Sequence, residues 1–249
     1  MIFKRYGKGP LLTRRDIPDM APEIVDPSSV FNPGAVTEDG KTILLLRVQT
    51  RGRRTFTVPA AGNGKKFKVG TDPVDFRGLD KMVEGDSEGP LEVFHVYDPR
   101  ITPIGDDLSV VTAVDTDRGC RLAVWRAAGD PATGFAGLDK LEMVGFTADR
   151  DTRNGVLFPD KIGDRYLMLD RPNDRRTGGG PLTGRGIVLS ESEDLVTWRE
   201  TGPVMQGRAR YWDELIGSGP PPFKTREGWL HIYHGVATHF LGSNVYQAL

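Results

Sequence analysis

The heptapeptide Val96–Thr102, which reads VYDPRIT, places an acid and an arginine on either side of a proline at the end of an apolar run. Proline lacks the N–H that a sheet ladder needs, so we predict that the strand stops at Pro99, with Asp98 and Arg100 at a sheet rim. A carboxyl group at a rim can donate a proton, and a neighbouring arginine can orient a polar substrate. The alternative is a structural turn with a surface ion pair.

Other polar and aromatic residues of the chain suit a polyhydroxylated ligand. Carboxylates accept pairs of sugar hydroxyls, guanidinium groups donate in forks, and aromatic rings such as Trp212 and Tyr233 can pack on a sugar. Cleavage of a glycosidic bond needs a proton donor and, for inversion, a second carboxylate or an anion on the opposite face. We expect Asp98 to be the donor. The candidates for the second role, which are also compatible with plain surface carboxylates, are Asp170, Asp213 and Glu214.

The segments that must position these groups recur along the chain. A proline follows a short strand candidate at Pro33, Pro99, Pro159 and Pro221, with spacings of 66, 60 and 62 residues. Each proline is followed by a turn and a strongly apolar run, for example Lys41–Val48. A repeat of this length with several strands in each unit is typical of β-propeller blades, and its regularity favours a propeller over a β-sandwich.

We therefore expect an all-β fold with one domain over residues 1–249, of which residues 1–29 form an irregular, proline-rich arm. In a propeller the ends of successive blades converge on one central pocket. This convergence would bring together Asn32, Asp98, Arg100 and the pair Asp160–Lys161.

Composition and charge exclude several classes of protein. Hydrophobic residues make up 38 % and charged residues 27 % of the chain, as in a globular protein, and a formal net charge of −1 gives no basic field for nucleic acid. No signal sequence or membrane span is visible, so we expect a cytoplasmic protein. Cys120 lies in an apolar run, which indicates a core thiol. His231 and His234 would point to opposite faces of a strand, so neither a metal nor another cofactor is expected.

Several longer stretches resemble glycoside hydrolase family 130, in family order. They read FNPGAV, LLLRVQTRGRRT, VYDPRIT, RNGVLFPDKI, MLDRPN, SESEDLVTW and WDELIGSGPPPFKTREGWLHIYHGV. The resemblance implies a five-bladed β-propeller that acts on β-mannosides, with Asp98 as the general acid. The substrate-binding residues expected on this basis are Asn32, Arg47, Arg51, Arg100, Arg153, Lys161, Asp170, Arg171 and His234.

The family contains inverting mannosidases and inverting mannoside phosphorylases, and the nucleophile separates them. Phosphorylases that this chain resembles tend to carry histidine in place of Asp170 and lysine in place of Leu215. A carboxylate and an apolar side chain weaken phosphate binding, whereas a carboxylate can activate water. We therefore expect a hydrolase of β-mannosides, with β-1,2-linked manno-oligosaccharides as substrates and with Asp213 or Glu214 as the base.

Two alternatives stay open. Arg153, Lys161 and His234 can hold an anion, so the chain can instead be an inverting phosphorylase that releases mannose 1-phosphate. A propeller that binds carbohydrate without catalysis is the second alternative. The expected partners are a manno-oligosaccharide, inorganic phosphate under the phosphorylase alternative, and a second copy of the chain in a homo-oligomer; neither nucleic acid nor a membrane is expected.

The chain stops at Leu249, within the fourth repeat, whereas family members continue into a fifth blade. A propeller without its closing blade exposes sheet edges. We therefore expect a propeller that lacks its C-terminal blade and needs a partner for stability.

Overall fold

The computed structural model describes residues 7, 9–176, 182–238 and 244–248. In this part of the chain the fold is all-β, with one short helix, α1 (Leu79–Glu84), and two 3-10 turns, η1 (Arg14–Asp16) and η2 (Pro131–Thr133). None of the described helices is long and apolar enough to cross a membrane.

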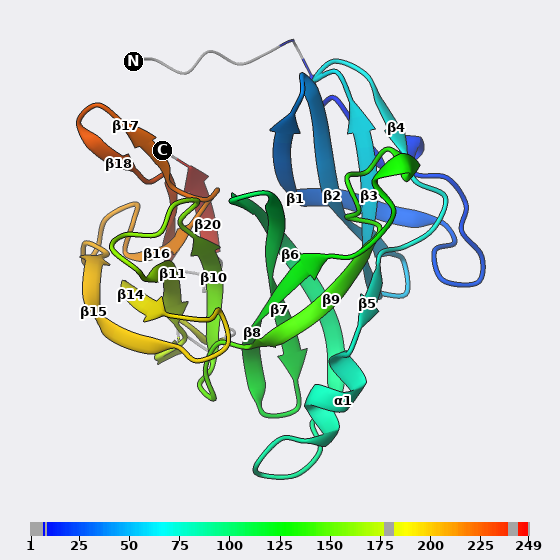
Figure 1. Cartoon of the computed structure of the whole chain (residues 1–249). Helices are drawn as coiled ribbons and strands as arrows, with labels where there is room; N and C mark the ends of the chain where they lie inside the picture. The colour runs from blue at the N-terminus through cyan, green and yellow to red at the C-terminus, as the bar shows by residue number, and fades with distance from the viewer. Residues whose placement is uncertain (1–6, 8, 177–181, 239–243, 249) are drawn as a thin grey trace.

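Four main sheets follow one another along the chain (Figure 1). The first contains β1 (Pro27–Glu38), β2 (Lys41–Thr50), β3 (Thr55–Gly62) and β4 (Phe67–Val69). The second contains β6 (Val93–Ile104), β7 (Asp107–Thr116), β8 (Gly119–Ala127) and β9 (Lys140–Phe146), with β5 (Asp75–Arg77) parallel to β9 at its edge. The third contains β10 (Thr152–Leu157), β11 (Tyr166–Pro172), β14 (Gly186–Ser192) and β15 (Arg199–Gln206). The fourth contains β16 (Leu215–Ser218), β19 (Tyr233–Thr238) and β20 (Asn244–Ala248).

Two hairpins lie outside these sheets: β12 (Arg175–Arg176) with β13 (Leu182–Thr183), and β17 (Phe223–Thr225) with β18 (Gly228–Leu230). The first strands of neighbouring sheets contact each other, β1 with β6, β6 with β10, and β10 with β16. The sheets are thus four propeller-like blades around these inner strands, as the repeats predicted. The described residues form four blades, so they do not confirm the expected count of five.

The described residues 9–26 of the N-terminal arm have an irregular backbone apart from η1, and they pack against the first blade; β1 begins at Pro27, within the expected bounds of the arm. Ile17, Met20 and Ile24 are buried and belong to one apolar cluster with Leu46 and Val58 of that blade. Burial of three large apolar side chains stabilises the edge of the propeller by several kcal/mol, at about 1.5–3 kcal/mol for each.

Strand β6 continues through Pro99, which contradicts the prediction that it stops there. Tyr97 pairs with Ala113 and Arg100 pairs with Val111, so Asp98 and Pro99 together face one residue of β7. This is a β-bulge, where proline costs no ladder hydrogen bond. Asp98 has φ +52°, a left-handed backbone that aspartate and asparagine tolerate better than most residues.

The same bulge occurs in the inner strands of the first and third blades. Asn32 of β1 has φ +45° and Asn154 of β10 has φ +57°, and the register shifts at both places. The third repeat is therefore anchored at Asn154 and not at Pro159, which lies beyond the end of β10. Pro221 also lies outside a strand.

Behind the Asp98 bulge, the core fixes the position of β7. The fully buried Trp125 donates from Nε1 to Thr112 Oγ1 at 2.8 Å, and Phe76 packs edge-on against its ring with centroids 4.8 Å apart. Thr112 is the residue that faces the bulge. The indole of Trp125 thus fixes β7, the strand that pairs with β6 on both sides of Asp98.

Gly155 allows close packing between the second and third blades, and we predict that Gly155→Ala is destabilising. An added Cβ would lie 2.7 Å from Leu122 Cδ1 and 2.9 Å from Val111 Cγ1. We expect the free energy of unfolding to fall by about 1–3 kcal/mol in urea titrations, as for other overpacked cores. Gly9→Ala, with no atom within 4 Å of its added Cβ, is the matched control. Equal effects of the two substitutions would contradict the prediction.

Candidate functional site

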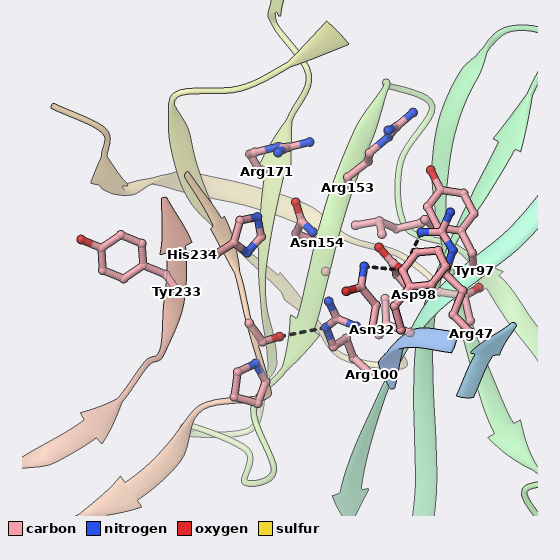
Figure 2. A pocket seen from close by; sticks show the side chains of 18 of the residues that line it. Asn32, Arg47, Tyr97, Asp98, Arg100, Arg153, Asn154, Arg171, Tyr233 and His234 are labelled. Atoms are coloured by element: carbon pink, nitrogen blue, oxygen red, sulfur yellow. Dashed lines mark hydrogen bonds and ion pairs between the residues drawn. The ribbon is translucent and has the colours of Figure 1, made fainter. Parts of the chain in front are cut away.

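A cavity of about 790 Å³ opens where the inner strands of the four blades converge. Figure 2 shows that its polar side chains come from all four blades and point toward a common space. The first blade provides Asn32 and Arg47, the second Asp98, Arg100 and Asp115, the third Arg153, Asn154 and Arg171, and the fourth His234. Four arginines and two aspartates give this cavity an excess of positive charge.

The carboxyl group of Asp98 is held through one of its oxygens. Oδ1 accepts hydrogen bonds from Asn32 Nδ2 at 3.1 Å and from Arg47 Nη1 at 2.8 Å. Arg47 in turn lies over the rings of Phe31 and Tyr97, 4.6 and 4.3 Å from their centroids. Oδ2 has no hydrogen-bond partner among the described residues, and the side chain is 17 % exposed. This geometry leaves one carboxyl oxygen available to a ligand in the cavity.

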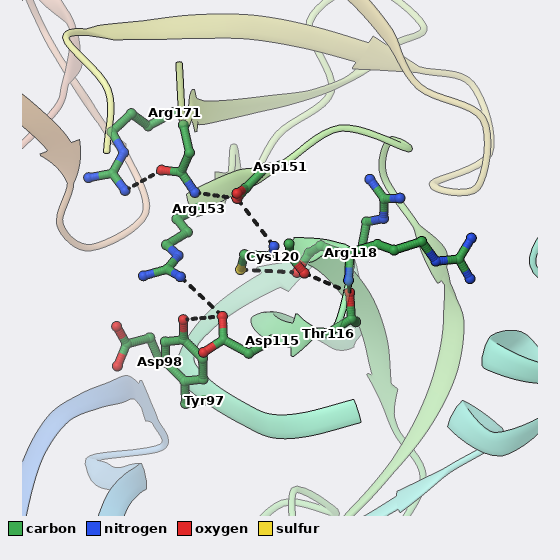
Figure 3. Close-up of polar contacts among 12 residues, drawn as sticks. Tyr97, Asp98, Asp115, Thr116, Arg118, Cys120, Asp151, Arg153 and Arg171 are labelled. Atoms are coloured by element: carbon green, nitrogen blue, oxygen red, sulfur yellow. Dashed lines mark hydrogen bonds and ion pairs between the residues drawn. The ribbon is translucent and has the colours of Figure 1, made fainter. Parts of the chain in front are cut away.

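A second carboxylate, Asp115, is engaged with protein donors through one of its oxygens. Its Oδ1 accepts from the Tyr97 hydroxyl at 2.9 Å and from Arg153 Nη2 at 3.1 Å (Figure 3). Burial, with the nearby Cys120, raises the pKa of Tyr97 well above its usual range, so the hydroxyl remains a donor at neutral pH. Asp115 therefore orients Tyr97 and Arg153.

The other two arginines of the cavity have no carboxylate within ion-pair distance among the described residues. Arg171 is 6 % exposed and donates from Nη2 to the amide oxygen of Asn173 at 2.7 Å. Arg100 donates to the backbone carbonyls of Gly219 and Pro99, at 2.8 and 3.1 Å. Burial and the nearby Arg153 lower the pKa of Arg171 to about 10, which leaves it charged at pH 7. Unneutralised buried cations are costly unless an anion joins them, so the cavity suits an anionic ligand.

His234 lines the fourth side of the cavity as a neutral imidazole at pH 7. Burial lowers its pKa to about 4, and Arg171 and Arg100 contribute in the same direction. A neutral imidazole donates one hydrogen bond and accepts another. The described residues contain no group of three His, Cys, Asp or Glu side chains that could hold a metal ion.

Three of the predicted substrate-binding residues lie outside the cavity. Arg51 is exposed in the turn after β2 and pairs with Asp26. Lys161 is exposed after β10, with Nζ 4.1 Å from the ring centroid of Tyr166. Its neighbour Asp160, which was expected to converge on the pocket, is also exposed.

Asp170 is the third of these residues, and it is buried on the far side of its sheet from the cavity lining. It is 1 % exposed and accepts from Arg150 Nη2 at 2.8 Å, Thr152 Oγ1 at 2.6 Å and Ser190 Oγ at 3.2 Å. Its oxygens are thus satisfied by neighbouring strands of the third blade. These hydrogen bonds account for the buried carboxylate of Asp170, and no contact with a ligand is needed to explain it.

The two candidate bases are also outside the cavity lining. Asp213 is buried just before β16 and accepts from Arg208 Nε, at 2.9 and 3.0 Å, and from the Tyr233 hydroxyl at 3.0 Å. Glu214 follows it in the same turn. Tyr233 does line the cavity, with its hydroxyl turned away toward Asp213 (Figure 2). The structure therefore assigns Asp213 to the support of Tyr233.

Sequence reasoning missed several residues that line the cavity, among them Tyr97, Asp115 and Asn154. Asn154 had a signal, because the pairs Asn32-Pro33, Asp98-Pro99 and Asn154-Gly155 share one pattern of a left-handed residue followed by a turn residue. Asp115 had no such signal in the sequence, because only the pairing of β7 with its neighbours brings it next to Tyr97 and Arg153.

Comparison with known proteins identifies similar chains. The sequence model of the family Glyco_hydro_130, described as beta-1,4-mannooligosaccharide phosphorylase, matches residues 12–249. The chain is 30 % identical to a beta-1,4-mannooligosaccharide phosphorylase of Ruminococcus albus over 94 % of its own length and 64 % of that protein, so it spans less than two thirds of this relative. It is 28 % identical to a beta-1,2-mannobiose phosphorylase of Listeria innocua, over 94 % of this chain and 75 % of that protein.

A solved structure supports the fold independently. The beta-1,2-mannobiose phosphorylase from Listeria innocua, in complex with beta-1,2-mannobiose, superposes with a TM-score of 0.71 at 20 % identity. The superposition covers 98 % of this chain and 77 % of that chain. The two proteins thus share their fold.

The environment of His234 predicts a pH dependence of stability. Between its usual pKa of 6.5 and about 4, the unfolded chain binds a proton that the folded protein does not. The free energy of unfolding should therefore fall as the pH is lowered through this window. In His234→Gln this contribution is absent, so its unfolding free energy should fall less steeply from pH 6.5 to 4. Parallel curves for the two proteins in urea titrations would contradict the lowered pKa.

Proposed function

Because this chain belongs to glycoside hydrolase family 130, we propose that it is an inverting β-mannoside phosphorylase. It cleaves manno-oligosaccharides with inorganic phosphate and releases mannose 1-phosphate. The observation that carries the proposal is Arg171, a buried guanidinium without a carboxylate partner among the described residues, in a cavity with an excess of arginines.

Asp98 supplies the proton in this proposal. Its Oδ2 is available to the cavity, while Asn32 and Arg47 fix Oδ1. The proton passes to the glycosidic oxygen, directly or through a sugar hydroxyl, as the bond from that oxygen to the anomeric carbon breaks. Asn32, Arg100 and Asn154 provide polar contacts for the mannosyl hydroxyls.

Phosphate is the nucleophile on the opposite face. Arg153 and Arg171 donate to its oxygens, and the neutral His234 adds one N–H donor. One phosphate oxygen forms a bond to the anomeric carbon as the glycosidic bond breaks, which inverts the configuration. No second carboxylate is required, in agreement with the engagement of Asp115 by Tyr97 and Arg153.

The hydrolase prediction has less support than this alternative. It depended on Asp170 and on Asp213 or Glu214, and none of the three lines the cavity. The relatives with which the chain aligns are named as phosphorylases of β-1,4- and β-1,2-linked mannosides. The proposed substrates are therefore β-linked manno-oligosaccharides of either linkage.

We further propose that the propeller type has five blades, as the family resemblance implies, of which the described residues form four, and that the protein is cytoplasmic. A single, buried cysteine, Cys120, is compatible with a reducing compartment. Assembly into a homo-oligomer remains an expectation that size measurements in solution would test.

The first experiment measures turnover of β-1,2- and β-1,4-mannobiose by the purified chain with and without inorganic phosphate. We expect mannose 1-phosphate to appear only when phosphate is present, because the cavity is built for an anion. Free mannose without phosphate would establish the hydrolase instead. Binding of mannobiose without any turnover would favour the non-catalytic propeller.

Asp98→Asn should lower kcat on mannobiose by about 10²–10⁴-fold, the usual contribution of a general acid. Asparagine keeps the left-handed backbone and can still accept from Asn32 and Arg47, so the fold should persist. The loss should be much smaller on a dinitrophenyl β-mannoside, whose leaving group needs no proton. Asp164→Asn, at an exposed aspartate outside the cavity, is the matched control. Equal losses on both substrates would contradict the role of Asp98 as acid.

A further inference from the structure

Arg171 is held in the cavity by an amide. Its Nη2 donates to Asn173 Oδ1 at 2.7 Å, and this is its one hydrogen bond to a side chain in the described part of the structure. Asn173 follows β11 and is 7 % exposed. At its other end, Asn173 Nδ2 donates to Asp151 Oδ1, and the backbone N–H of Asn173 donates to the Asp151 carbonyl at 2.9 Å. Figure 3 shows this line of contacts from Arg171 to Asp151.

The chemistry of the two neighbours fixes the orientation of the amide. A guanidinium group only donates hydrogen bonds, and an ionised carboxylate only accepts them. The amide of Asn173 satisfies both because its oxygen faces Arg171 and its nitrogen faces Asp151. Asp151 is itself anchored to β8, since its Oδ1 accepts from the backbone N–H of Cys120 at 3.2 Å. The line is therefore rigid from β8 to the cavity.

The amide also keeps the negative charge of Asp151 one side chain away from Arg171. Arg153, in contrast, is in direct contact with the carboxylate of Asp115 at 3.1 Å. A carboxylate in contact with a buried arginine offsets most of the attraction that the arginine exerts on a third ion. Arg153 is thus partly neutralised, whereas Arg171 retains its charge.

We infer that Asn173 is a positioning residue that fixes Arg171 without neutralising it, so that the guanidinium keeps its charge for an oxygen of the substrate phosphate. The inference rests on the proposed phosphorolysis and adds a residue to it. It assigns to the neutral amide of Asn173 a function that a carboxylate of the same shape cannot perform.

The test exchanges the amide and the carboxylate in the double variant Asp151→Asn/Asn173→Asp. The new aspartate can accept from Arg171, as Asn173 does. Because Asp151 Oδ1 accepts from both Asn173 and Cys120 in the wild type, the new asparagine keeps one of these two hydrogen bonds. Net charge is preserved, and the negative charge moves into contact with Arg171. We expect the KM for phosphate to rise about tenfold or more, since Arg171 becomes ion-paired, with a smaller change in the KM for mannobiose. The Kd of inorganic phosphate, measured by calorimetry, should rise in parallel.

Asp151→Asn alone is the matched control, because it leaves the amide of Asn173 beside Arg171. Its KM for phosphate should equal the wild-type value or be lower. Asn173→Ala is the second test variant, in case the exchange disturbs folding. It removes the one side-chain hydrogen bond that Arg171 makes among the described residues, and the KM for phosphate should again rise. Circular dichroism and thermal melting establish that each variant is folded.

Different outcomes would overturn the role of Asn173 and the proposed phosphorolysis. A folded exchange variant, or a folded Asn173→Ala variant, with unchanged KM and Kd for phosphate would overturn the role of Asn173. Absence of both phosphate-dependent turnover and phosphate binding in the wild-type chain would instead overturn the proposed function.

Discussion

The backbone of the inner strands carries the constraint on which the cavity depends. In three blades, one asparagine or aspartate at positive φ forms a β-bulge, namely Asn32, Asp98 and Asn154. At a β-bulge, the side chains no longer alternate regularly between the two faces of the sheet. Because the inner strands contact each other, the three reoriented side chains meet in one cavity. A left-handed backbone costs free energy, which the paired strands on each side offset.

Positive charge in excess of negative charge is the second property of this cavity. Asp98 accepts a hydrogen bond from Arg47, and Asp115 accepts one from Arg153. Arg100 and Arg171 are fixed by neutral oxygens instead. Among the described residues no carboxylate matches these two guanidinium groups, so their desolvation costs free energy that the proposed phosphate would offset.

The proposed acid and the proposed phosphate-binding side of the cavity are physically connected. Arg47 bonds Asp98 and lies over the ring of Tyr97, whose hydroxyl bonds Asp115, and Asp115 bonds Arg153. In the proposed function, one network across the first three blades thus positions the groups on the two faces of a bound mannoside. Such a network would limit independent movement of the proposed acid and the proposed nucleophile site.

The sequence by itself determined the all-β repeat and predicted Asn32, Asp98 and Arg100 for the central pocket, because these follow from short-range patterns of turns, prolines and alternation. It could not determine which carboxylates face a ligand. Asp170 and Asp213 looked equivalent to Asp98 as acidic residues next to strands, but Thr152 and Tyr233, on paired or adjacent strands, satisfy their oxygens. Whether a charge is neutralised depends on partners that are distant in sequence, so only the tertiary structure decided that Asp98 faces the cavity and that the cavity suits an anion.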